Sequence, residues 1–193
     1  MTASNLAKID VDGNVIAGRE HQVNLAGFII HSAIHMTRSE ENHVVMHTHT
    51  RAGMAIAAIK EGLLPISMFV TVFHNRIGYH EYEGASLYPD ERERIVKSLG
   101  PHKAMILKNH GLMAVGRTVP SASCGCIVWS APARFSSMHA AAAGTLDLVS
   151  PAIADRSAAD LDSYQGMQPS AEGEIEFAAL MRKLDKIDDR YRF

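Results

Sequence analysis

The chain has 193 residues, 47% of them hydrophobic, and a formal net charge of −2 at pH 7. These values suit one globular domain with a sizeable core, and no block of like charges points to nucleic acid or an anionic membrane as partner. No apolar run approaches the ~20 residues that cross a bilayer, and no export signal is recognised. The two cysteines, Cys124 and Cys126, are too close in sequence for a comfortable disulfide. We therefore expect a soluble protein in the reducing cytoplasm.

The hydrophobic pattern predicts strands and helices that alternate through the first two thirds of the chain. Turn and capping residues set their limits, for example the acidic residues after Pro89 that open one helix and Gly100 that closes it. In chain order we expect a β-hairpin over 8–16, a helix over 25–36, a buried strand over 44–46, a short helix over 52–60, a loop or edge strand over 76–84, a helix over 90–99, and strands over 104–109 and 112–115.

The last third of the chain has a different character. Residues 121–126 are small and turn-prone, Pro132 interrupts any helix around it, and residues 144–173 are rich in Ala, Asp, Ser and Gly. We expect 121–173 to be irregular and 174–188 to form an amphipathic C-terminal helix. No internal repeat or boundary divides the chain, so residues 1–193 are interpreted as a single domain.

Two histidines stand at the end of the buried strand over 44–46. His47 and His49 follow its apolar residues, with Thr48 between them. Side chains two positions apart in a strand point to the same face, so both imidazoles project together. Neutral imidazole suits zinc and similar ions, and a catalytic zinc usually has three protein ligands and one open position. This pair therefore predicts two ligands of a metal site, with a third elsewhere in the chain.

The strongest candidate for the third ligand is His110. It ends the apolar strand over 104–109 and precedes Gly111, where the backbone can turn sharply. Two strand ends side by side in one sheet would bring His110 to His47 and His49. The alternative is that all three are ordinary solvated or hydrogen-bonded histidines.

A further histidine pair lies on the predicted helix over 25–36. His31 and His35 are one helical turn apart and share a face. This spacing is compatible with a metal site of their own. The alternative is that they line the cleft or face solvent beside the strand that follows.

Six short motifs follow one another between Thr2 and about Val119. They are Thr2-Ala3-Ser4-Asn5-Leu6, Asn24-Leu25-Ala26-Gly27-Phe28 with His31 and His35, His47-Thr48-His49-Thr50-Arg51-Ala52-Gly53, Glu61-Gly62-Leu63-Leu64-Pro65, Gly78-Tyr79-His80-Glu81-Tyr82-Glu83-Gly84, and Asn109-His110-Gly111-Leu112. In this order and combination the motifs resemble the class II aldolase/adducin family.

The resemblance implies a three-layer α/β/α sandwich with a mostly antiparallel central sheet, often assembled as a homotetramer with active sites between subunits. It implies that His47, His49 and His110 hold a divalent metal, usually Zn²⁺, with Mn²⁺ or Co²⁺ as alternatives. In the family's aldolases the metal holds the oxygens of a hydroxyketone, and its charge stabilises the enediolate left when the C–C bond breaks.

Two positions bear on proton transfer in that chemistry. The family's aldolases carry a glutamate general base one turn before the position of His31, and here that position is Gly27. His31 or a metal-bound hydroxide is a candidate substitute. Tyr82 falls where the family's aldolases place a tyrosine, from the adjacent subunit, that protonates the product. The alternative for Tyr82 is a packing aromatic at an interface.

The chain departs from the family pattern in two places. The match at Thr2 lies well inside the family's domain, so we expect a shortened member that lacks the first helix, the early strands and half of the substrate pocket. Residues 121–137 replace a helix of the type Leu-Glu-Arg-Ala-Cys-Gln-Ile-Gln. A codon series that can encode 129–136 spells that helix when it is read in a shifted frame. We therefore hypothesise that this segment is translated out of frame.

Taken together, the sequence predicts metal-dependent C–C bond cleavage, by retro-aldol reaction or decarboxylation, of a small hydroxy-carbonyl or keto-acid substrate. His47, His49 and His110 would hold the metal, with Tyr82 and His31 as the catalytic candidates. One rival is a non-catalytic, adducin-like interaction module, of the cytoskeletal type, which Gly27 and the missing pocket favour. Another is an inactive remnant.

Overall fold

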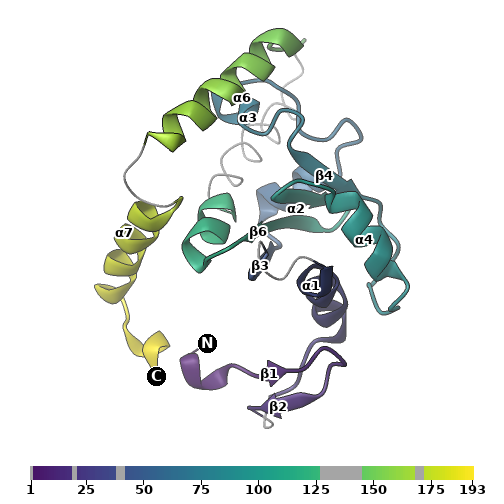
Figure 1. Cartoon of the computed structure of the whole chain (residues 1–193), viewed down its shortest axis with the longest axis vertical. Coiled ribbons are helices and arrows are strands. Elements are labelled where there is room, and N and C mark those ends of the chain that lie inside the picture. The colour runs from purple at the N-terminus through teal and green to yellow at the C-terminus, as the bar shows by residue number, and fades with distance from the viewer. Residues whose placement is uncertain (1, 19–20, 38–41, 127–144, 168–171) are drawn as a thin grey trace.

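The computed structural model describes residues 2–18, 21–37, 42–126, 145–167 and 172–193 (Figure 1). The described part opens with a 3₁₀ turn, η1 (Ala3–Asn5), and the predicted hairpin, in which β1 (Lys8–Ile9) pairs antiparallel with β2 (Val15–Ala17). Figure 1 shows the two ends of the chain side by side. There the backbone N–H and the hydroxyl of Ser4 both donate to the carbonyl of Phe193, at 3.3 and 3.0 Å.

The centre of the fold is a four-stranded sheet in the order β3-β6-β5-β4. Its strands are β3 (Val44–Thr48), β4 (Ile77–His80), β5 (Ala104–Leu107) and β6 (Gly111–Gly116). β6 runs antiparallel to both β3 and β5, whereas β4 and β5 are parallel. The expectation of a mostly antiparallel sheet is therefore corrected to a mixed one. The parallel pair arises because a helix carries the chain back between β4 and β5, so both strands start from the same edge.

One face of the sheet is covered by α1 (Leu25–Thr37) and α4 (Glu91–Leu99). Alternate strand residues point to this face, as the period of two requires. They pack against buried residues of both helices in one cluster: Ile30, Ala33, Ile34, Val45, Ile95, Leu99, Met105, Leu107, Met113 and Val115. Burying a side chain of this size stabilises the fold by about 1.5–3 kcal/mol, so this cluster fixes α1 against the strand that carries His47.

The opposite face is covered by α2 (Arg51–Ala57) and by a helix over 119–126. Ile56 and Ala57 of α2 pack on Ile106 and Leu112. In the second helix, the Ser123 hydroxyl lies 3.5 Å from the Met46 sulfur. The three-layer α/β/α arrangement expected from the sequence is thus confirmed.

The last third of the chain is more regular than the sequence predicted. Residues 151–166, expected to be irregular, form α6 (Pro151–Gly166), and the expected irregularity of 121–126 is wrong as well, because these residues are helical. In α6 the alanines explain the difference, since alanine is the strongest helix former. The frameshift hypothesis concerns 129–136, which lie outside the described residues.

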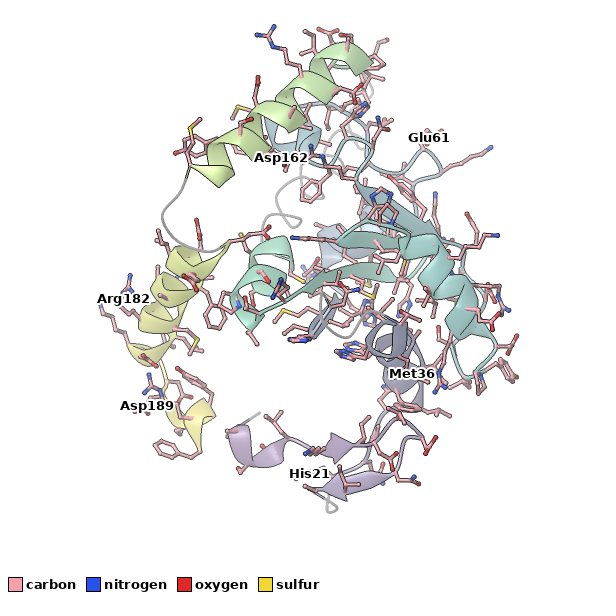
Figure 2. The ribbon with its side chains drawn as sticks, in the orientation of Figure 1. His21, Met36, Glu61, Asp162, Arg182 and Asp189 are labelled. Carbon is pink, nitrogen blue, oxygen red and sulfur yellow. The ribbon has the colours of Figure 1, made fainter. Side chains whose placement is uncertain are left out.

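Tertiary contacts tie α6 to the body of the fold. It packs on the short α3 (Met68–Thr71), where the Thr71 and Ser157 hydroxyls are 2.7 Å apart. Arg76 forms a bidentate ion pair with Asp162, which is labelled in Figure 2.

The C-terminal helix is found where it was predicted, as α7 (Glu174–Asp185), followed by η2 (Arg190–Arg192). Its apolar side chains are not buried within the described part of the chain, and Ile175 and Leu184 are 60% and 40% exposed. Arg182, labelled in Figure 2, is exposed as well. None of the described helices has the length and apolar character required to span a membrane.

Candidate metal centre

The end of β3 presents two histidines on the face of the sheet that α1 covers. His47 pairs with Met113 of β6, and His49 follows the last pairing, Thr48 with Leu112. The Nε2 atoms of the two histidines are 2.6 Å apart, and their ring centroids 4.5 Å. The same-face geometry inferred from the sequence is therefore present.

His110 joins the pair from the turn between β5 and β6. The backbone N–H of His110 donates to the carbonyl of Leu107 at 3.1 Å and closes the turn. Asn109 takes a left-handed conformation with φ 54°, which asparagine tolerates well. The centroid of the His110 ring lies 4.6 Å from that of His47 and 4.8 Å from that of His49. One ligand nitrogen from each of the three rings lies within 4.8 Å of the others.

Three imidazole nitrogens are a donor set that fits zinc. Zinc–nitrogen bonds are about 2.0–2.1 Å, so two ligands of one ion lie at most about 4.2 Å apart. Here the ligand nitrogens lie within 4.8 Å of one another, and the Nε2 atoms of His47 and His49 are 2.6 Å apart, so the rings would have to rotate to hold one ion. The Nδ1–H of His47 donates to the carbonyl of Leu112 at 3.0 Å, which leaves Nε2 as the metal-binding atom. Such support from beyond the ligands is typical of metal sites.

The electrostatics of the cluster favour neutral rings. Burial, together with the nearby rings of His110 and His49, lowers the pKa of His47 to about 4. Burial and the His49 ring also lower the pKa of His110, while Glu91 acts in the opposite direction. At neutral pH the rings of His47 and His110 therefore carry no proton that an incoming cation must displace.

The depressed pKa of His47 predicts how the metal-free protein responds to acid. The ordinary pKa of histidine is about 6.5, so between about pH 4 and 6.5 the unfolded chain binds more protons than the folded chain. The contribution of His47 to the free energy of unfolding should be fully present above pH 6.5 and should be lost as the pH drops toward 4. Urea unfolding of metal-free protein at pH 7.5, 6.5 and 5.5 measures this. His47→Gln should flatten the profile; equal slopes in the two proteins would contradict the assignment.

Gly111 allows the rings to come this close. A Cβ atom there would lie 2.5 Å from the carbonyl oxygen of Thr48, 3.0 Å from His47 Cε1 and 3.1 Å from His49 Cδ2. Outside its own residue and the two chain neighbours, a Cβ atom essentially never lies within 3.0 Å of a heavy atom, and the nearest atom here belongs to a strand backbone that cannot swing away. A side chain at 111 therefore has to separate β3 from β6 or displace the rings.

We expect Gly111→Ala to weaken zinc binding by at least about tenfold and to lower the melting temperature, because overpacking of this kind costs roughly 1–3 kcal/mol. Competition titration with a zinc chelator and a thermal melt measure the two effects. Gly166→Ala is the matched control, since a Cβ there meets nothing within 4 Å. Wild-type affinity in Gly111→Ala would show that the rings do not depend on this close approach.

A cavity of about 800 Å³ lies between the hairpin and α1. Its wall is largely apolar and includes Val11, Phe28 and Met36 together with His31, His35 and Gly27. The structure agrees with the alternative given for this pair, that the two histidines line a cleft or face solvent, since both line this cavity and His35 is exposed. Met36 is labelled at the end of α1 in Figure 2. The charge of His31 contributes to the lowered pKa of His47, which places the two rings within electrostatic reach. Burial and His35 lower the pKa of His31 in turn.

Tyr82 lies on the segment that follows edge strand β4. It is 57% exposed, and together with His110 it lines a second cavity of about 10 Å³. The structure thus places Tyr82 on the His110 side of the cluster, whereas His31 lies on the side of the large cavity.

The sequence analysis missed a buried polar pair beside His110. His80 and Glu91 are 5% and 4% exposed, and His80 Nε2 lies 3.3 Å from Glu91 Oε1. Glu91 was interpreted only as an acid in the first turn of a helix. The signal that could have found it is His80 in the edge-strand motif, which pointed to a polar partner nearby.

Comparison with known proteins decides the family. A family model described as "Class II Aldolase and Adducin N-terminal domain" matches residues 1–133. The chain belongs to this family. A putative aldolase class 2 protein of Caulobacter vibrioides is 48% identical over 61% of the chain and 46% of its own length. One of Pseudomonas aeruginosa is 33% identical over the whole chain and 74% of its own length. Human gamma-adducin is 31% identical over 98% of the chain and 28% of its own length.

Solved structures of this class II aldolase and adducin family share the fold. An aldolase II superfamily protein from Pseudomonas syringae aligns with a TM-score of 0.90 and 36% identity, covering the whole chain and 76% of that protein. An L-fuculose 1-phosphate aldolase from Glaciozyma antarctica aligns with a TM-score of 0.78 and 27% identity, covering the whole chain and 73% of that protein. The chain spans about half the length of the Caulobacter relative and about three quarters of the Pseudomonas ones.

Proposed function

We propose that this chain is a divalent-metal-dependent carbon–carbon lyase that cleaves a small hydroxy-carbonyl or keto-acid substrate, by retro-aldol reaction or decarboxylation. The observation that carries the proposal is the cluster of His47, His49 and His110, whose nitrogens lie within 4.8 Å of one another. The cavity of about 800 Å³ is connected to the cluster through His31, which lines the cavity and whose charge acts on His47. Similarity to an L-fuculose 1-phosphate aldolase agrees with this reaction class.

In this proposal the three histidines hold Zn²⁺, or Mn²⁺ or Co²⁺. When bound, the ion supplies a Lewis acid that stabilises negative charge developing on the substrate oxygen as the C–C bond breaks. The carbonyl of Leu112 fixes the His47 ring so that Nε2 faces the cluster. The largely apolar wall of the large cavity offers a surface on which the carbon skeleton of a small substrate can pack.

Proton transfer is assigned to His31 and Tyr82. Gly27 lines the large cavity but has no group to titrate. The pKa of His31 is lowered by burial, so its ring is neutral at pH 7 and able to accept a proton. Tyr82, which lines the small cavity with His110, is the candidate donor to the product, and by family resemblance it would act in the site of the adjacent subunit. The chain would act as a homo-oligomer, a tetramer by family resemblance; the exposure of Tyr82 and of the apolar residues of α7 supports this.

The second candidate function is an adducin-like interaction module that keeps the fold without catalysis. Gly27 at the position of the general base favours it, as does 31% identity to human gamma-adducin over 98% of the chain. The discriminating experiment loads the protein with Zn²⁺, Mn²⁺ or Co²⁺ and assays cleavage of hydroxy-carbonyl phosphates, hydroxyketones and β-keto acids. Turnover that disappears in His49→Ala supports the lyase. No turnover with a full metal complement supports the interaction module.

A further inference from the structure

Four polar side chains meet between β4, α4 and the segment that joins them. His80 Nε2 lies 3.3 Å from Glu91 Oε1, and His80 Nδ1 lies 3.0 Å from the Ser98 hydroxyl. The hydroxyl of Ser86 donates to the same Glu91 oxygen at 3.0 Å. His80, Ser86 and Glu91 are each no more than 5% exposed. A carboxylate buried to this degree is uncommon unless it is paired, and this one joins three separate pieces of backbone.

Glu91 holds the segment 81–88 against α4 from the inside. Ser86 sits in a left-handed conformation with φ 49°, which a serine adopts only when its surroundings impose it. In this conformation its hydroxyl reaches the carboxylate of Glu91. On the outer side of the same segment, Arg94 makes a bidentate contact with Glu83 at 2.6–2.9 Å. That pair is exposed to solvent and screened by it, so the buried anchor is the stronger of the two.

The same segment and the same carboxylate border the candidate metal centre. Tyr82, Glu91 and His110 line one cavity of about 10 Å³, which is too small for a substrate and about the size of a single water molecule. The backbone also connects these parts, because the Lys108 N–H donates to the carbonyl of His80 at 2.8 Å, two residues before His110. A shift of the His80–Glu91 pair would therefore move both the turn that carries His110 and the segment that carries Tyr82.

We propose that Glu91 is a positioning residue of this centre: through His80 and Ser86 it fixes the segment 81–88, which carries Tyr82, and through the backbone of His80 it supports the turn that carries His110. The effect on order in 81–88 is independent of the reaction, whereas the effect on turnover rests on the proposed lyase function. Glu91 does not touch the large cavity, so it is not assigned a proton-transfer role of its own.

The first test measures order in the segment without using activity. Amide hydrogen exchange is compared for wild type, Glu91→Ala and Glu93→Ala, the last being a matched control at an exposed glutamate on the same helix. We expect Glu91→Ala to speed exchange in 81–88 on the order of tenfold, with 28–34 of α1 unchanged, and Glu93→Ala to match wild type. Glu91→Gln, which keeps an acceptor for Ser86, should recover most of the protection.

The second test asks whether Glu91 acts through Tyr82. In the metal-loaded protein, Glu91→Ala should lower kcat at least about tenfold while KM changes little, because misplacement of a reacting group penalises the chemical step. In a Tyr82→Phe background the same change should lower kcat less than about twofold, since the group being positioned is already gone. If Glu91 only supported stability, Glu91→Ala would lower kcat by the same factor in the wild-type and in the Tyr82→Phe background.

The outcomes separate this proposal from the lyase function. If folded Glu91→Ala protein exchanges its amides in 81–88 at the wild-type rate, the positioning role is overturned. The same holds if Glu91→Ala lowers kcat by equal factors in the wild-type and Tyr82→Phe backgrounds. Faster exchange in a protein that turns over no substrate supports the positioning of the segment while it counts against the lyase function. Should Glu91→Ala fail to fold, Ser86→Ala removes one hydroxyl from the same network. Ser86→Ala should speed amide exchange in 81–88 by a smaller factor than Glu91→Ala. An unchanged exchange rate there would also overturn the proposal.

Discussion

About one equivalent of divalent metal per chain is the expected result of metal analysis on the purified protein, and less than about a tenth of an equivalent is expected for the triple variant His47→Ala, His49→Ala, His110→Ala. The reason is that a facial site of three imidazoles binds zinc tightly, whereas the remaining pair, His31 and His35, offers only two ligands. His49→Ala alone should already abolish stoichiometric binding, because it leaves only two ligands.

The control for this experiment is His102→Ala, a histidine outside the cluster in the turn after α4. It should bind metal like wild type. Circular dichroism establishes that each variant is folded before the metal is counted by mass spectrometry. If the folded triple variant kept a full complement of zinc, the three histidines would not be the ligands, and the lyase proposal would lose its main support.

A gain of aldolase activity is expected from Gly27→Glu. General base catalysis contributes about 10²–10⁴ in rate, and wild type has no carboxylate at this point of the cavity wall. The structure has room for the change, because a Cβ at 27 has its nearest neighbour, Asn24 Cβ, at 3.8 Å. A glutamate in the first turn of α1 also suits the helix dipole. Retro-aldol cleavage of a hydroxyketone phosphate, followed with a coupled assay, measures the gain.

Gly27→Gln is the matched control, since it adds the same volume without a titratable group. A rise in kcat seen only in Gly27→Glu, with a pH dependence near the pKa of a carboxyl, identifies base catalysis. Decarboxylation of a β-keto acid needs no proton abstraction to break the bond, so Gly27→Glu should leave that activity within about twofold of wild type. Equal gains in both variants would mean that side-chain volume is responsible and would count against a latent aldolase.

Sequence reasoning could place the candidate metal centre because two of its three histidines lie two positions apart in the chain. His47 and His49 share a face because of the strand period, and no tertiary information is needed to see it. The contact with His110 was inferred from two strand ends alone, and the pairing of β3 with β6 brings it about. The parallel pairing of β4 with β5 was not predicted, because strand direction depends on where α4 carries the chain.

The burial of Glu91 could not be predicted from the sequence. Its position after Pro89 fits an acidic residue in the first turn of an exposed helix, and the helix is there. Its burial depends on His80 and Ser86, which approach from a strand and a segment before the helix. Likewise, α6 was missed because its hydrophobic pattern is weak and its contacts with α3 come from 86 residues away. Tertiary contacts override local preference in both cases.

The pairing of β3 with β6 also links metal affinity to the folding equilibrium. Ligands from β3 and from the turn before β6 are about sixty residues apart in the chain, so they converge only after the sheet has closed. An ion bound by these ligands binds the folded chain and not the unfolded one. By mass action it adds about 2.7 kcal/mol to the unfolding free energy at a free concentration 100 times its Kd, and about 4.1 kcal/mol at 1,000 times. The melting temperature of this protein should therefore rise with zinc concentration, and a chelator should lower it back to that of the metal-free chain.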